Sequence, residues 1–385
     1  MMNKNIAFFF LSLSFYQTGN WLQNTALNFS VYSSTGSTLK VGIVQFLQYA
    51  PLLFLPLIGG TLIDRLNKYM MLMFTQFTLM ILSFFLYLAT KNGINSVHLE
   101  VLYIVVLMGI LKTFDIPLRQ TVMAHLVDKD KLRNATSIYS TIVNLSRFLG
   151  PFLFGVVVSF SSVHFSFLLS ALLMTASVLV LFFLRYDFQK EGKTYVVDNF
   201  LNVIDFLFQN EGIRNIFLLT SIAGVFGWFF YVLLPEYTYN ILKLPSYAYG
   251  YLTSFAGIGS VAGSLSLLVI RKLSIFMLMR VGILTYTFGT LLWFAALYFY
   301  PLLGLGIFLN GYGLSLFYAC ANAYVQLFSP LNIKGRLLSL YTSIFIGTQP
   351  LSFILGGLLE SYLGIWRTLL FVISAYITII FFIRR

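Results

Sequence analysis

Charged residues are scarce in this chain of 385 residues. Asp, Glu, Lys and Arg together make up 9% of it, whereas soluble globular domains carry about 25%. Hydrophobic residues make up 59%. A chain with so few charges cannot cover the surface of a soluble fold of this size. The composition therefore excludes a water-soluble protein and indicates an integral membrane protein.

The chain is also poor in residues that bind metals or form disulfides. It has one cysteine, Cys320, and three histidines that lie far apart, at His98, His125 and His164. Neither Cys-x-x-Cys nor His-x-x-x-His spacing occurs, so we expect no disulfide framework, no metal site and no cofactor. An enzyme within the bilayer would need clustered histidines or paired carboxylates at one depth. The sequence has neither, so we do not expect an enzyme.

Although the net charge is +12, its distribution does not fit a nucleic-acid-binding protein. Such proteins gather their basic residues on one domain, whereas here the Lys and Arg residues are scattered through short polar loops. We therefore expect no nucleic-acid partner, and we expect the lipid bilayer to surround the chain.

Long apolar segments divide the chain into two groups of six. With about 20 apolar residues for each span, we expect an all-α membrane protein with twelve transmembrane helices in two pseudo-symmetric six-helix bundles. Residues 1–184 form the first bundle and residues 213–385 the second, while 185–212 form a cytoplasmic linker with an amphipathic helix. The expected spans are 6–33, 41–63, 69–90, 97–120, 135–159, 162–184, 213–236, 247–270, 274–298, 301–327, 336–359 and 363–383.

The basic residues predict how these spans are oriented. With the amino terminus inside, only Lys40, Lys91, Lys243 and Arg367 fall in outer loops, and Lys112 and Arg147 fall within spans. The remainder of the 24 lie on the inner side. The positive-inside rule therefore places both termini in the cytoplasm, and we expect a multi-pass protein of the cell membrane.

A polar turn between the second and third spans is the most specific motif. Residues 59–68 read GGTLIDRLNK, with Gly59, Gly60, Asp64, Arg65 and Lys68 between two apolar runs. This run resembles the G-x-L-x-D-R-x-x-[RK] loop of the major facilitator superfamily of secondary transporters. The resemblance implies a transporter that works by alternating access, with this turn as part of its gate.

The two halves share a repeat at an offset of 202 residues. Residues 133–142 (RNATSIYSTI) parallel residues 335–344 (GRLLSLYTSI), and the register continues to Gly155 and Gly357. Duplicated six-span units place the substrate site near the bilayer midplane, between the repeats. The spans that begin near 135 and 336 are therefore expected to be counterparts.

Polar residues follow one face of four expected spans, as they do where helices line a wet cavity. Interhelical hydrogen bonding without a cavity is the alternative for any single amide. In the superfamily that the chain resembles, these four helices line the central cavity. From these stripes and from the fifth span we expect the cavity residues to be Gln17, Asn20, Asn24, Asn144, Arg147, Trp228, Tyr231, Tyr312, Tyr318 and Asn322.

Asp115, in the fourth span, has two possible roles. Burial could make it a proton-carrying carboxylate. Alternatively, it lies on the same side as the Asp64-Arg65-Lys68 turn, and in relatives of the drug-exporter type an acid at this position pairs with the basic residues of the turn. We favour this gating role, with Lys112 as a possible additional partner.

Arg147 is the deepest charge that the sequence predicts. A guanidinium stays charged at any realistic pH, so it could hold an anionic or carbonyl-rich substrate, or form a structural pair with Asp115. The residues that follow it, Gly150, Pro151 and Gly155, resemble the Gly-Pro motif of antiporter branches of the superfamily. Proline kinks the span, and the glycines allow a neighbouring helix to approach.

The resemblance covers nearly the whole chain and is strongest to the branch that holds the enterobactin exporter and macrolide efflux proteins. Members often carry an acid beside the first-span tryptophan, whereas this chain has Asn20. We expect a monomeric, proton-coupled exporter of an amphipathic small molecule such as a drug, macrolide or siderophore. Alternatives are a metabolite uptake symporter or uniporter, a lysophospholipid flippase, or a receptor that no longer transports.

Overall fold

The computed structural model describes residues 4–54, 67–91, 99–184, 200–270, 273–330 and 333–383. Within these ranges the chain is helical and contains no β-strand. The α-helices described in the first half are α1 (Lys4–Thr35), α2 (Thr38–Tyr49), the single turn α3 (Pro51–Phe54), α5 (Lys68–Lys91), α6 (Leu99–Leu126), α7 (Leu132–Phe160) and α8 (His164–Phe182). A short α9 (Phe200–Gln209) follows.

The second half has the same all-helical character. Its helices are α10 (Glu211–Gly227), α11 (Phe229–Glu236), α12 (Ser246–Val269), α13 (Ile275–Ala295), α14 (Pro301–Phe328) and α15 (Lys334–Phe382). Gly364, with a φ of 75°, divides the 49-residue α15 into two helices. Since an L side chain rarely adopts this backbone conformation, glycine is the residue that permits the sharp turn.

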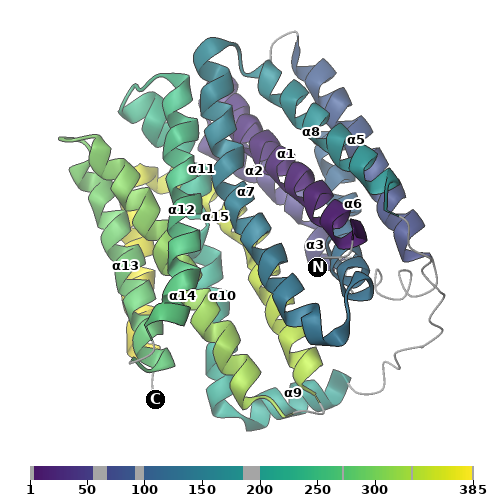
Figure 1. Ribbon diagram of the computed structural model, residues 1–385. Helices are drawn as coiled ribbons and strands as arrows, with labels where there is room; N and C mark the ends of the chain where they lie inside the picture. Colours follow the sequence, from purple (N-terminus) through teal and green to yellow (C-terminus); the bar gives the residue numbers. More distant parts are fainter. Residues whose placement is uncertain are drawn as a thin grey trace.

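Eight helices in the described ranges are long and apolar enough to cross a bilayer, and α15 counts as one of them. The 32-residue α1 and the 24-residue α12 have the length as well, but polar and small residues dilute their apolar sequences. The fold is that of an all-α, multi-pass membrane protein, consistent with the twelve expected spans. The predicted amphipathic segment of the linker contains α9, which lies across one end of the molecule (Figure 1).

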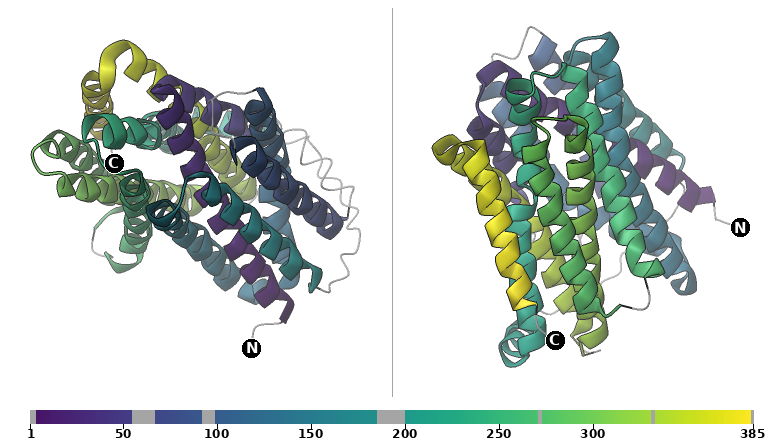
Figure 2. Two further views of the ribbon diagram at one scale, coloured as in Figure 1. Left: turned by 90° about the horizontal axis from the view of Figure 1, so that it is seen from above. Right: turned by 90° about the vertical axis from the view of Figure 1, so that its left-hand side faces the viewer.

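The helices of the first half lie beside those of the second (Figures 1 and 2). The most extensive contacts between the halves are those of α7 with α12 and of α2 with α15. Both contacts depend on glycine, because a Cβ atom at Gly257 of α12 would lie 2.5 Å from the backbone nitrogen of Phe148. A Cβ atom at Gly42 of α2 would likewise lie 2.5 Å from the carbonyl oxygen of Phe353. These backbones therefore pack without intervening side chains.

Candidate functional site

An open cavity of about 450 Å³ lies between the two halves. Its walls come from α1, α2, α3, α6, α7, α14 and α15. The lining residues cluster in the parts of α7 and α15 that follow their first turns, and toward the last turns of α6 and α14. The cavity therefore lies toward the end of the molecule at which α7 and α15 begin.

Most of the predicted cavity residues contribute to its wall. Those that line it directly are Gln17, Asn20, Asn144, Arg147, Tyr318 and Asn322. Three others, Asn24, Trp228 and Tyr231, line a smaller chamber of about 20 Å³ next to it. This chamber has room for about one water molecule. Trp21, Tyr49 and Gln349 line both spaces and so form the boundary between them.

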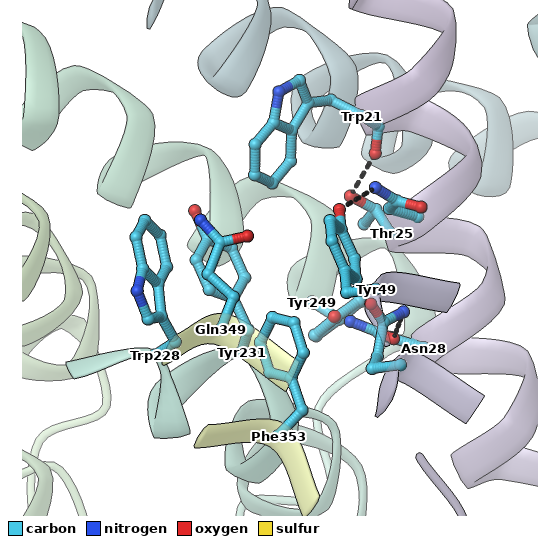
Figure 3. A pocket seen from close by; sticks show the side chains of 11 residues that line it. Trp21, Thr25, Asn28, Tyr49, Trp228, Tyr231, Tyr249, Gln349 and Phe353 are labelled. Carbon is cyan, nitrogen blue, oxygen red and sulfur yellow. Dashed lines mark hydrogen bonds between the residues drawn. The ribbon is translucent and has the colours of Figure 1, made fainter. Parts of the chain in front are cut away.

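Aromatic rings dominate the small chamber. Figure 3 shows Trp21, Tyr49, Trp228 and Tyr231 turned toward the same space, with Phe353 at its edge. The Trp21 and Tyr231 ring centroids lie 5.8 Å apart, and those of Trp228 and Tyr231 lie 6.0 Å apart. Because Trp21 and Tyr49 come from the first half and the others from the second, this aromatic layer forms where the two halves meet.

Tyr312 lies in neither space. Its hydroxyl is 2.8 Å from the Ser266 hydroxyl on α12, and the glycines of α12 pack against its backbone. The close packing of α14 on α12 leaves no room for a cavity at this position. The stripe that includes Tyr318 and Asn322 faces the cavity only in the part of α14 beyond this contact.

Among the described residues that line the cavity, Arg147 is the one that carries a charge. Its guanidinium carbon lies 5.5 Å from the Trp21 ring centroid and 5.8 Å from that of Trp228. The Nε atom is buried and has no hydrogen-bond partner among the described residues. The Arg147 side chain forms no ion pair with Asp115, which pairs with Arg119. A positive charge held between two indole rings, with an unused donor, can bind an anionic group.

The cavity wall repeats itself at the offset seen in the sequence. Five residues of α7 line the cavity, and each has a counterpart 202 residues later on α15 that also lines it. The pairs are Tyr139 and Tyr341, Ser140 and Thr342, Val143 and Phe345, Asn144 and Ile346, and Arg147 and Gln349. Gln349 was not among the predicted site residues, although continuing the repeat register by five residues would have found it. Tyr49 and Trp21 were also missed as lining residues. Trp21 lies four residues after Gln17 and three before Asn24, on the same face of α1, so the polar stripe could have found it.

The predicted gating residues are described only in part. Gly59, Gly60, Asp64 and Arg65 lie outside the described residues, whereas Lys68 begins α5. Asp115 is 1% exposed, and its Oδ2 atom accepts a hydrogen bond from Arg119 Nε at 2.7 Å. Its Oδ1 atom accepts one from Gln76. Neither Lys68 nor Lys112 pairs with it within the described part of the chain, so its gating role stays a prediction.

The predicted Gly-Pro motif lies within α7, where Pro151 sits inside the helix. A Cβ atom at Gly150 would lie 2.4 Å from Trp21 Cβ, so α1 packs directly on this turn. A Cβ atom at Gly155 would lie 2.9 Å from the Tyr251 ring of α12. The two glycines thus admit one neighbour from each half of the molecule.

The end of the molecule opposite the cavity is closed by contacts between the halves. Thr38, at the start of α2, donates a hydrogen bond of 2.5 Å to Glu236 at the end of α11. Phe29 of α1 lies 5.7 Å from Tyr249 of α12 and 5.9 Å from Tyr239, measured between ring centroids. These side chains separate the small chamber from that surface.

The comparisons with known proteins agree with this architecture. The family model described as transmembrane secretion effector matches residues 2–384. The staphyloferrin A transporter of Staphylococcus aureus (strain NCTC 8325 / PS 47) is 27% identical over 268 residues, which cover 69% of this chain and 67% of that protein. The multidrug efflux pump Tap of Mycolicibacterium fortuitum is 24% identical over 367 residues, which cover 91% of this chain and 88% of that protein.

Solved structures share the fold over the whole length. A point mutant of the nucleoside transporter NupG is 15% identical to this chain, with a TM-score of 0.80. The match covers 98% of each of the two chains. A bacterial homologue of the iron transporter ferroportin, in an inward-facing state, is 18% identical with a TM-score of 0.75 and full coverage of both chains. At these identities the likeness concerns the fold alone. The family description and the curated relatives are those of transporters and not of enzymes.

Proposed function

Because this chain belongs to the transmembrane secretion effector family of the major facilitator superfamily, we propose that it is a proton-driven exporter of an amphipathic small molecule. Two six-helix bundles, 1–184 and 213–385, rock about the cavity and expose it to one side of the membrane at a time. Residues 185–212 link them. The name of one relative, a multidrug efflux pump, supports export as the direction, whereas the name of the staphyloferrin A transporter gives no direction.

The observation that carries this proposal is the isolated guanidinium of Arg147 in an aromatic-walled cavity. Indole and phenol rings offer large, adaptable apolar contacts, and a single charge fixes the orientation of a ligand. Trp21 and Trp228 flank that charge at 5.5 and 5.8 Å. A molecule with an apolar body and an anionic or carbonyl-rich group fits this combination.

We also propose that the protein lies in the cell membrane as a monomer, with both termini cytoplasmic. The cavity then opens toward the cytoplasm, and the Thr38–Glu236 contact lies at the outer face. Cytoplasmic substrate would enter this state, and protons would enter when the outer contacts separate. Export follows if the inward proton gradient drives the return step.

Transport into everted membrane vesicles under an imposed pH gradient tests the proposal. A panel of cationic, neutral and anionic amphipathic dyes is offered, and we expect gradient-dependent accumulation of at least one. Arg147→Gln should lower uptake at subsaturating substrate about tenfold or more, because a hydrogen bond to a charged group contributes roughly 1.5–3 kcal/mol.

Arg214→Gln is the matched control, since Arg214 lies outside the cavity, where it donates a 3.0 Å hydrogen bond to the Phe208 carbonyl and lies 3.8 Å from Glu211. We expect it to transport like the parent protein. If no dye accumulates under any gradient, or if Arg147→Gln transports as well as the control, the proposal is wrong.

A further inference from the structure

Lys112, in the middle of α6, is a buried cation that the cavity just described does not use. Its side chain is 4% exposed. Its Nζ atom has no hydrogen-bond partner among the described residues. The contact that it does make is with the Tyr49 ring, whose centroid lies 5.9 Å from Nζ. A charge within a membrane protein that lacks a partner is costly and is typical of a functional position.

The carboxylate next to Lys112 along the helix forms no ion pair with it. Both oxygens of Asp115 are occupied, one by Arg119 at 2.7 Å and the other by Gln76. The Arg119 guanidinium also stacks on the Tyr16 ring, 3.9 Å from its centroid. Asp115 and Arg119 therefore form a self-contained neutral pair, and the charge of Lys112 is left over within the described part of the chain.

Lys112 lies on the cavity-facing side of α6. Ile116 and Gln120 line the cavity, and Lys112 precedes them at intervals of four residues, so the three positions share one helix face. At ~1.5 Å per residue, Lys112 is about 21 Å from the Leu126 end of α6, and Arg147 is about 22 Å from the Leu132 end of α7. The two cations thus lie at similar depth.

Tyr49 stands between the two cations. Its ring lines the cavity and the small chamber, and it also covers Lys112. Its hydroxyl accepts one hydrogen bond, of 3.0 Å, from Asn24 Nδ2. Rotation of this one side chain would open a path from the cavity to Lys112, at the cost of one neutral hydrogen bond and of the ring contact with Phe353, whose centroid lies 5.6 Å away.

We propose that Lys112 is a second anion-binding position and that the substrate carries two acidic groups. This inference rests on the proposed export function. Arg147 binds the first group in the open cavity, and Lys112 binds the second after the Tyr49 ring moves aside. No carboxylate is among the described residues that line the cavity, so a dianion would meet two positive side chains and no opposing negative one from this part of the chain, whereas a cationic drug would be repelled.

Three xanthene dyes of similar shape and different charge test this inference. At slightly alkaline pH fluorescein is a dianion, its 3-O-methyl ether is a monoanion and rhodamine 123 is a cation. Binding to the purified protein is measured by fluorescence polarisation. We expect the protein to bind fluorescein about tenfold more tightly than the ether, as one additional charge-assisted contact implies. Rhodamine 123 should bind most weakly.

Variants connect this preference to Lys112. Lys112→Gln should bring the affinity for fluorescein down to that for the ether, whereas Lys112→Arg should keep the preference. Tyr49→Ala should keep it as well and accelerate fluorescein binding, because the covering ring is gone. Lys131→Gln is the control for loss of a lysine charge, since Lys131 is exposed and pairs with Asp128 at the surface.

The inference is overturned if the protein does not bind fluorescein, if it binds the two anions equally, or if Lys112→Gln keeps the preference. The same dyes separate this failure from failure of the proposed function. Gradient-driven export of rhodamine 123 or the ether without fluorescein binding would remove the second anion position and leave export intact. The absence of export for every dye would remove both.

Discussion

The contact between α2 and α15 permits a quantitative prediction about the balance between conformations. A Cβ atom at Gly42 would lie 2.5 Å from the carbonyl oxygen of Phe353. Because the obstructing atom belongs to the backbone, no change of rotamer relieves the clash. The helices would have to separate by about 1 Å to reach ordinary van der Waals distance, and such overpacking costs about 1–3 kcal/mol.

This cost falls on one conformation only. The two helices belong to different halves, and the contact lies on the same side as the Thr38–Glu236 bond, where the molecule is closed. In alternating access these halves separate at this end when the cavity opens to the other side. Gly42→Ala should therefore lower the population of the present conformation relative to the opposite one by about thirtyfold, if the cost is ~2 kcal/mol.

Thiol labelling measures this shift. The single cysteine is first removed by Cys320→Ala, and Asn322→Cys places a thiol in the open cavity. We expect Gly42→Ala to slow the labelling of this thiol by membrane-impermeant maleimide in everted vesicles. Gly304→Ala is the matched control, because a Cβ atom there meets Phe255 at 3.5 Å, an ordinary contact within one half.

An unchanged labelling rate in a correctly folded Gly42→Ala protein would refute the reasoning. Equal slowing by Gly304→Ala would do so too, because the effect would then be a general consequence of substitution in the helices.

Two further predictions concern polar contacts. Thr38→Val removes the 2.5 Å hydrogen bond that joins the halves, so it should slow labelling of the same cavity thiol severalfold, and a rate equal to the parent's would contradict a closing role for this bond. Asp115→Asn breaks the buried pair with Arg119 and leaves that guanidinium uncompensated, which should cost about 3–5 kcal/mol of stability. Thermal unfolding in detergent measures this cost. The double variant Asp115→Leu with Arg119→Met should recover much of the lost stability. An unchanged melting temperature in the single variant would show that the pair is not needed.

The helices and their order could be predicted from the sequence because lipid imposes a simple rule. A run of about 20 apolar residues has few alternatives to a helix in a bilayer. The expected span at 135–159 corresponds to α7 (Leu132–Phe160), and that at 301–327 to α14 (Pro301–Phe328). The all-α transporter fold that the sequence predicted is confirmed by the family match and by the solved structures.

The cavity was harder to predict, since periodicity indicates a polar face but not what that face meets. Asn322 and Tyr312 share a stripe, yet Asn322 lines the cavity and Tyr312 contacts Ser266 on α12. The difference depends on where two helices diverge, which is a tertiary property. Tyr49 was missed because an aromatic residue in an apolar helix carries no periodic signal.

The partner of a buried charge was likewise not predictable from spacing. Lys112 and Arg119 lie at three and four residues from Asp115, and both distances allow contact on a helix. The structure selects Arg119. Its guanidinium also stacks on Tyr16 of α1, and this contact cannot be read from α6 alone.

The match between α7 and α15 has a mechanical consequence. The two walls of the cavity share one helix register, and at one pair of positions the first carries Arg147 and the second carries Gln349. In the proposed cycle, an acidic substrate would therefore stay bound to the first bundle through its contact with Arg147. The second bundle, whose described lining residues offer amides, hydroxyl groups, rings and apolar side chains but no charge, would move past it, so that the substrate would remain nearly still while the access route changed from one membrane face to the other.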